Sequence, residues 1–133
     1  MHKMRILVDY NMEGQATLIW DTLVKEGWRE LIDLEMFMFV DVGLAPNSDD
    51  RTVWRFAQQY QMLLLTNNRS DNEENSLEQT IREENTMMSY PVLTVATLHR
   101  IGEREYRIQC IERLIDIIVD IDNYLGTGRI FIP

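Results

Sequence analysis

The sequence has a single cysteine, Cys110, among its 133 residues, so the chain cannot form an internal disulfide. Basic residues are also few: 13 Lys and Arg stand against 22 Asp and Glu, which gives a net charge of −9. Because phosphate backbones are bound chiefly by Lys and Arg, this balance argues against a protein that holds nucleic acid through its overall field. It leaves open a nuclease in which bound divalent ions offset a local cluster of carboxylates.

Long apolar runs and phosphate-binding motifs are missing as well. No run of about eighteen apolar residues occurs, so no membrane-spanning segment is predicted. The first residues do not read as a signal peptide, which would have a charged region followed by an apolar one. We therefore expect a cytoplasmic protein. Neither GxxxxGK[ST] nor GxGxxG is present, so ATP-dependent and dinucleotide chemistry lack support. The two histidines carry little information, since His2 is near the start of the chain and His99 fits a surface loop.

Short aliphatic runs alternate with amphipathic segments along the chain. Predicted strands cover residues 4–8, 34–42, 62–65, 90–97 and 129–132, and predicted helices cover 14–27, 48–60, 76–85 and 104–125. Aliphatic runs without alternation are typical of strands that are buried on both faces. Strands that alternate with helices predict a mostly parallel central sheet with right-handed crossovers. We therefore expect residues 1–133 to form one α/β domain, a three-layer sandwich.

The longest helical pattern, residues 104–125, is apolar on more than one side. Ile117 and Val119 lie off its main apolar stripe, and such a helix is buried on more than one side. A neighbouring helix or the second subunit of a homodimer would cover the extra surface. Cys110 lies in the same pattern, so we expect its thiol to be buried and inert.

Acidic and amide side chains follow the predicted strands. Asp9 comes directly after the first strand, and Asp49 and Asp50 open the helix that precedes the third strand. The third strand is followed by Asn67, Asn68, Asp71, Glu73 and Glu74. In open parallel sheets, ligands gather beyond the carboxyl ends of the strands. Oxygen ligands from these loops would hold Mg²⁺ or Mn²⁺, and two such ions about 3.5–4 Å apart can cleave a phosphodiester bond.

Several of these side chains also have simpler interpretations. Asp49 and Asp50 favour the amino end of a helix, an effect worth about 0.3–1 kcal/mol each. The asparagines after the third strand would supply turn geometry, and the glutamates that follow are typical solvated loop acids. Asp9 is the strongest candidate, because a carboxylate directly after a buried strand must be hydrated, paired or ligated.

Two stretches of the chain carry a family resemblance. In ILVDYNM, Asp9 and Asn11 follow the first strand, and DDRTVWRFAQQYQMLLLTNNRSD joins a helix to the third strand. These stretches resemble the PIN-like superfamily, and within it the small bacterial proteins that open with a strand and a D-E-N-L-type motif. In those relatives an acid starts the helix and the next strand ends in T-x-D-x-D-F. Matching Ala57 and Thr66 to that pattern puts Asp50 at the helix-start acid.

The chain departs from that pattern after the third strand. The two acids of the T-x-D-x-D motif fall on Asn68 and Ser70, and Asp71 comes one residue late. An amide oxygen lacks the charge of a carboxylate and cannot act as a base, and Arg69 beside it would repel a cation. The resemblance therefore implies a reduced acidic site. The implied metal ligands are Asp9, Asp50, Asn68 and Asp71, and the implied catalytic residues are Asp9, Asp50 and Asp71.

The function that this resemblance implies is cleavage of single-stranded RNA by a Mg²⁺- or Mn²⁺-dependent endoribonuclease, in the setting of a toxin with a partner antitoxin. The missing acid and the broadly apolar long helix also fit a non-catalytic protein–protein interaction module with the same fold. A response-regulator-like domain matches the alternation of strands and helices, but it needs clustered acids after the first strand and an Asp at the end of the third. This chain has one acid after the first strand and amides after the third.

Overall fold

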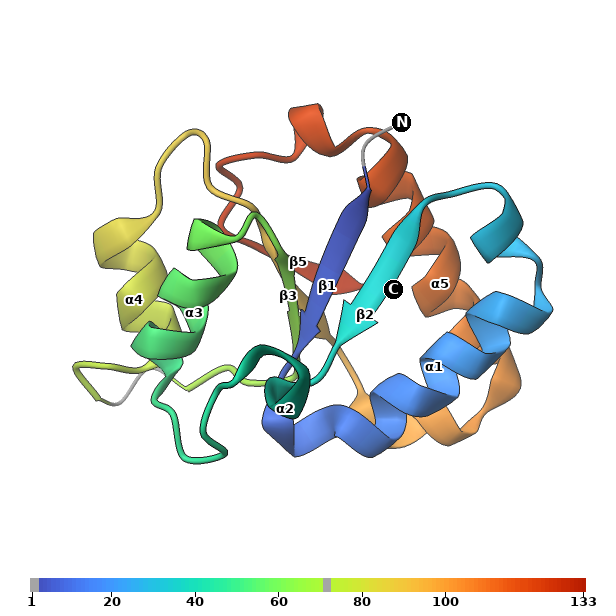
Figure 1. Ribbon diagram of the computed structural model, residues 1–133, viewed down its shortest axis with the longest axis horizontal. Helices are drawn as coiled ribbons and strands as arrows, with labels where there is room; N and C mark the ends of the chain where they lie inside the picture. The colour runs from blue at the N-terminus through green and yellow to red at the C-terminus, as the bar shows by residue number, and fades with distance from the viewer. Residues whose placement is uncertain (1–2, 71–72) are drawn as a thin grey trace.

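The structure is a computed structural model that describes residues 3–70 and 73–133 (Figure 1). Its strands and α-helices are β1 (Met4–Val8), α1 (Glu13–Lys25), β2 (Leu34–Phe37), α2 (Phe39–Val42), α3 (Asp50–Gln59), β3 (Leu63–Thr66), α4 (Leu77–Glu84), β4 (Val92–Val95), α5 (Arg104–Val119) and β5 (Arg129–Ile132). Short 3₁₀ helices are η1 (Tyr10–Met12), η2 (Trp28–Glu30), η3 (Leu98–Gly102) and η4 (Ile121–Asn123).

The strands form one sheet in the order β2-β1-β3-β4-β5, and all neighbouring pairs are parallel. In the centre of the sheet, Val8 pairs with Leu65, and the next main-chain N–H, that of Asp9, donates to the carbonyl of Leu65 at 2.9 Å. Because the strands are parallel, their carboxyl ends meet at one edge of the sheet. The residues that follow β1 and β3 are therefore brought to the same place.

Helices cover both faces of the sheet, which confirms the predicted three-layer α/β sandwich (Figure 1). Helices α1 and α5 pack against one face, where side chains such as Ile6, Val8 and Leu65 are buried. Helices α2, α3 and α4 lie over the other face, where Leu7 and Leu64 are buried. The central strands are thus apolar on both faces, as their aliphatic runs predicted.

The predicted strand over residues 34–42 is wrong in its second half. Strand β2 ends at Phe37, and the chain turns into the short helix α2, in which Phe39 is buried. The carboxylate of Asp41 accepts a 2.8 Å hydrogen bond from the main-chain N–H of Met38 and so closes the first turn of this helix. Gly43 then ends it in the left-handed conformation, with φ of 79°. A run of apolar residues fits a buried strand and a buried helix equally, so periodicity could not separate them.

The long helix is also shorter than predicted, because α5 ends at Val119 and the separate turn η4 follows. Ile117 is fully buried in the chain's own core, so this part of the extra apolar surface is covered by the same domain. Cys110 is buried, and its burial raises the pKa of the thiol to about 11, as expected for an inert cysteine. Within residues 3–70 and 73–133, no helix combines the length and the apolar character needed to cross a bilayer.

Candidate functional site

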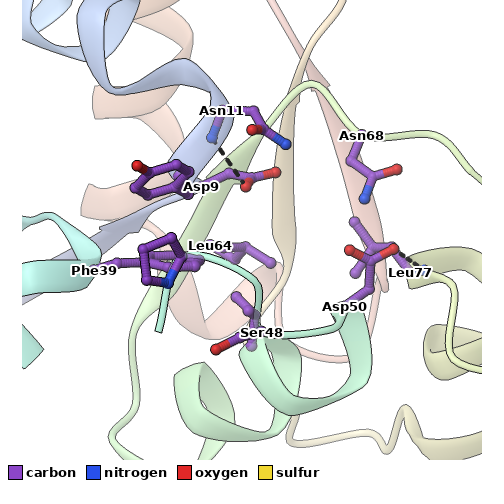
Figure 2. Close-up of a pocket in the computed structure, with 11 residues that line it drawn as sticks. Asp9, Asn11, Phe39, Ser48, Asp50, Leu64, Asn68 and Leu77 are labelled. Atoms are coloured by element: carbon purple, nitrogen blue, oxygen red, sulfur yellow. Dashed lines mark hydrogen bonds between the residues drawn. The ribbon is translucent and has the colours of Figure 1, made fainter. Parts of the chain in front are cut away.

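A small cavity lies at the carboxyl ends of β1 and β3, between the sheet and the start of α3 (Figure 2). Its volume is about 60 Å³, and its lining residues are Asp9, Tyr10, Asn11, Phe39, Pro46, Ser48, Asp50, Val53, Leu64, Asn68 and Leu77. The fold therefore brings together three of the four implied metal ligands, Asp9, Asp50 and Asn68, and Asn11 lines the same cavity. The fourth, Asp71, lies outside the described residues.

Asp9 is held in place by neutral hydrogen-bond donors. Its Oδ2 accepts a 2.6 Å hydrogen bond from the hydroxyl of Thr66, and its Oδ1 accepts a longer one, 3.4 Å, from the main-chain N–H of Asn11. The carboxylate is only half-buried, and within the described residues no cationic side chain pairs with it. A carboxylate oxygen has two lone pairs, so both oxygens of Asp9 retain accepting capacity beyond these bonds.

Asp49 and Asp50 take different roles at the start of α3. Asp49 is the N-cap residue, since its side chain accepts a 2.8 Å hydrogen bond from the main-chain N–H of Thr52, and this bond lowers the pKa of Asp49. The simple interpretation of Asp49 as a helix-start acid is therefore confirmed. Ser48, the residue before Asp49, does not cap α3, and its hydroxyl instead donates to the carbonyl of Ala45 at 2.7 Å.

Asp50 ties two helix starts together across the cavity wall. Its Oδ2 accepts a 3.0 Å hydrogen bond from the main-chain N–H of Leu77, the first residue of α4 (Figure 2). The same oxygen accepts a 3.3 Å bond from the hydroxyl of Ser70. Ser76 precedes that helix and caps it by accepting a 3.3 Å bond from the N–H of Gln79. Asp50 therefore stabilises α4 and also presents a carboxylate to the cavity.

Asn68 continues the hydrogen-bond chain that begins at Asp9. Its main-chain N–H donates to the hydroxyl of Thr66 at 2.9 Å, and its side-chain oxygen accepts from the main-chain N–H of Ser70 at 2.8 Å. Thr66 is completely buried, so its hydroxyl needs both partners. The amide oxygen of Asn68 thus has a role in turn geometry, as the simple interpretation expected, and its residue also lines the cavity.

Arg129 supports this loop from the opposite end of the chain, and sequence reasoning missed it. Its guanidinium donates to the carbonyl of Asn68 at 2.7 Å, to the hydroxyl of Thr94 at 2.6 Å, and to the carboxylate of Glu78 at 2.6 Å. The side chain is only 9% exposed. An arginine at the start of an otherwise apolar strand was the available signal, because a buried guanidinium must find a counter-ion and acceptors.

Arg69 was expected to repel a bound cation, but its side chain is not part of the cavity lining. It donates to the carbonyl of Ala96, and its guanidinium carbon lies 5.3 Å from the ring centroid of Phe131 on β5. Glu73 and Glu74 are exposed, as predicted for loop acids.

The cavity wall includes an aromatic pair that the sequence did not reveal, Tyr10 and Phe39, whose ring centroids are 5.9 Å apart. Phe39 was missed because its segment was predicted as a strand.

The donor set of the cavity fits a hard divalent ion. The described residues place two carboxylates and two amide side chains, those of Asn11 and Asn68, on its wall, all of them oxygen donors for a metal. Nowhere in the described parts of the chain do three or more His, Cys, Asp or Glu side chains form a group that could hold a metal ion. Mg²⁺ keeps several waters and is commonly bound by only one or two carboxylates. Since a water molecule needs roughly 10–15 Å³ of such space, the cavity has room for one ion with part of its hydration shell.

Comparisons of the chain with protein-family models, with curated proteins and with solved structures give no match. The chemistry of the cavity is therefore inferred from its own residues. Two carboxylates face a space that is too small to enclose a nucleotide but open to ions and water. Such an arrangement can hold a hydrated cation against a substrate that lies across the mouth of the cavity.

Proposed function

We propose that this protein is a PIN-like, Mg²⁺- or Mn²⁺-dependent endoribonuclease with a reduced acidic site. The observation that supports the proposal is that Asp9 and Asp50, which are far apart in the chain, line one small cavity at the carboxyl edge of a parallel sheet. In this proposal the two carboxylates hold the metal, and the amide of Asn68 completes the protein ligands. Asp71, which the family resemblance adds to the set, lies outside the described residues.

The residues of the chain position these ligands. The hydroxyl of Thr66 fixes the carboxylate of Asp9, and the N–H of Leu77 fixes that of Asp50. Prearranged ligands lose little freedom when an ion binds, which favours binding by a small donor set. The bound ion would polarise a phosphoryl oxygen and lower the pKa of an attacking water.

The shape of the site favours a single-stranded substrate. The cavity cannot enclose a base, so only a phosphate of the chain would reach the metal. Tyr10, which is 44% exposed and tilted against Phe39, gives an aromatic surface at the cavity on which an unpaired base can stack. With a net charge of −9, the protein would depend on the cation to offset repulsion between its acids and the phosphates. The proposed setting is that of a toxin with a partner antitoxin.

The proposal is tested by calorimetric titration with Mg²⁺ and Mn²⁺, together with cleavage of a single-stranded RNA by the wild type and by Asp9→Asn. We expect binding of one ion and loss of both binding and cleavage in the variant. Equal cleavage by the two proteins would assign the activity to a contaminant. Failure of the wild type to bind either ion at millimolar concentration would end the nuclease proposal.

The alternative is a non-catalytic protein–protein interaction module, and the internal hydrogen bonds of the site favour it. Oδ2 of Asp50 already accepts from Leu77, and the amide oxygen of Asn68 already accepts from Ser70. In this alternative the acids only tie loops together, and the protein would bind a partner without metal. Retained folding and undetectable metal binding in the wild type would support this reading over the nuclease.

A further inference from the structure

Two of the proposed metal ligands, Asp50 and Asn68, share one set of hydrogen bonds through the loop after β3. Ser70 donates its main-chain N–H to the side-chain oxygen of Asn68 at 2.8 Å and its hydroxyl to Oδ2 of Asp50 at 3.3 Å. The carbonyl of Ser70 accepts a 3.2 Å bond from the main-chain N–H of Glu78 in α4. Because the same helix donates the N–H of Leu77 to Asp50, the position of the loop relative to α4 sets the positions of both ligands.

Arg129 joins this loop to α4 from the last strand. Its Nη1 donates to the carbonyl of Asn68 and to the hydroxyl of Thr94, and its Nε donates to the carboxylate of Glu78. Thr94 is completely buried on β4, so this contact fixes the guanidinium against the sheet. A planar guanidinium holds several acceptors in one fixed geometry, which a flexible ammonium group does not.

The side chain of Arg129 has two opposed effects on a cation in the cavity. Its positive charge would repel the cation, and its hydrogen bonds hold the ligands in place. The repulsion is offset by the ion pair with Glu78, whose carboxylate lies 2.6 Å from the guanidinium. Loss of a residue that orients metal ligands typically lowers metal affinity about 10–100-fold. We therefore expect the positioning effect to exceed the repulsion.

We propose that Arg129 is a positioning residue of the metal site. It is not part of the cavity lining, and it holds the loop after β3 and the start of α4 in the arrangement that brings Asn68 and Asp50 to the cavity. Asp9 is held separately, by the hydroxyl of Thr66. This inference rests on the proposed metal site, and it gives Arg129 a role in metal binding in addition to its role in stability.

The test is calorimetric titration of the full chain with Mn²⁺, for the wild type and for Arg129→Met. We expect the variant to bind Mn²⁺ about tenfold more weakly, at a temperature at which circular dichroism shows that it is folded. If Arg129 acted only as a nearby charge, its removal would strengthen binding. If it served only folding, the affinity of the folded variant would not change. Either of these results would overturn the proposal.

Arg107→Met provides a matched control on the opposite face of the sheet. Arg107 lies on α5, and its part-buried guanidinium donates at 2.9 Å to the hydroxyl of Thr22 and to the carbonyl of Ile101. The control therefore removes a guanidinium that also bonds several acceptors but does not contact the loop after β3. We expect it to bind Mn²⁺ as the wild type does. An equal loss of affinity in both variants would contradict a specific role for Arg129.

Arg129→Lys keeps the charge and decides the question if Arg129→Met does not fold. A lysine cannot bridge the same acceptors, so we expect its Mn²⁺ affinity to fall below that of the wild type, and an unchanged affinity would refute the proposal. In a double-mutant cycle, Arg129→Met should cost less affinity in Asn68→Ala than in the wild type, because one ligand that it positions is already gone. Fully additive losses would also refute it.

These measurements separate the positioning role from the metal site on which it rests. Absence of Mn²⁺ binding by the wild type would refute the proposed metal site and the role of Arg129 together. Wild-type binding that Arg129→Met leaves unchanged would refute the positioning role alone.

Discussion

The hydroxyl of Thr66 donates a 2.6 Å hydrogen bond to Oδ2 of Asp9. The same hydroxyl accepts from the main-chain N–H of Asn68, so one buried side chain links the residue that ends β1 to the loop that follows β3. Because a hydroxyl can donate once and accept as well, a threonine satisfies both neighbours at once. The position of the Asp9 carboxylate at the cavity therefore depends on a residue of the neighbouring strand.

Replacing this hydroxyl should destabilise the protein. In Thr66→Val, Oδ2 of Asp9 and the N–H of Asn68 lose their partner at a buried position, and we expect a loss of about 1–3 kcal/mol in the free energy of unfolding. Chemical denaturation measures it. The control is Thr17→Val, at an exposed position where the hydroxyl bonds within its own helix to Glu13, and it should change stability little. An unchanged denaturation midpoint in Thr66→Val would show that the buried hydroxyl does not stabilise the folded protein.

The two roles of Asp50 can be separated by two substitutions. Asp50→Ala removes the acceptor for the N–H of Leu77, and we expect a loss of about 0.5–2 kcal/mol, as for other helix caps. Asp50→Asn keeps an acceptor oxygen but removes the charge, so stability should change less while the affinity for Mn²⁺ falls about tenfold, or about 1.4 kcal/mol. Asp49→Asn, one residue earlier, is the matched control and should bind Mn²⁺ as the wild type does. Equal Mn²⁺ affinity in Asp50→Asn and the wild type would remove Asp50 from the ligand set.

Restoring a carboxylate after β3 should strengthen metal binding. In Asn68→Asp, the acceptor for the N–H of Ser70 is retained and one negative charge is added at the cavity. We expect higher affinity for Mg²⁺ and Mn²⁺ in calorimetric titration. Asn67→Asp adds the same charge at a position outside the cavity lining and should have a smaller effect. Unchanged or weaker affinity in Asn68→Asp would place Asn68 outside the ligand shell.

Arg129 should prove important for stability through its pair with Glu78. Arg129→Met leaves the carboxylate of Glu78 and the carbonyl of Asn68 without their shared donor, and we expect a loss on the order of 3 kcal/mol. Adding Glu78→Leu to this variant removes the unpaired charge and should recover much of the loss. Urea denaturation of the two single variants and the double variant measures the coupling. Purely additive losses would contradict a direct interaction between the two side chains.

The Asp49 cap of α3 should make the free energy of unfolding depend on pH in the acid range. The bond from the N–H of Thr52 lowers the pKa of Asp49 below its ordinary value of 3.8. A group whose pKa is lower in the folded state adds stability above its unfolded pKa and loses it as the pH falls through the folded pKa. Asp49→Asn does not titrate, so the stability difference between wild type and variant should narrow as the pH falls below 3.8. A difference that stays constant across that range would contradict the assignment of Asp49 as the charged cap.

Much of the fold could be predicted from the sequence because the signals are local. Aliphatic runs such as MRILV and LLLT mark strands with both faces buried, and the strands predicted over residues 90–97 and 129–132 are found at Val92–Val95 and Arg129–Ile132. The predictions failed where one local pattern fits two structures. Residues 38–42 are apolar enough for a strand, and the turn into α2 depends on the Asp41 side chain and on Gly43.

Some residues of the candidate site could also be predicted from local sequence, and others could not. The position of Asp9 directly after a buried strand, and of Asp50 at a helix start, is evident from the sequence. Arg129 and Phe39 could not be assigned to the neighbourhood of these acids, because no local pattern relates the last strand, or the turn after β2, to the loops after β1 and β3. Their contacts join segments that meet only once the strands have paired.

By itself, the sequence determined most of the strands and helices and that acids and amides follow the strands, because hydrophobic periodicity and turn chemistry act over a few residues. Only the tertiary structure decided that Asp9, Asp50 and Asn68 line one cavity and that Arg129 holds the loop after β3. These features depend on the strand order and register, which arise from burying both faces of the sheet under helices that are distant in the chain.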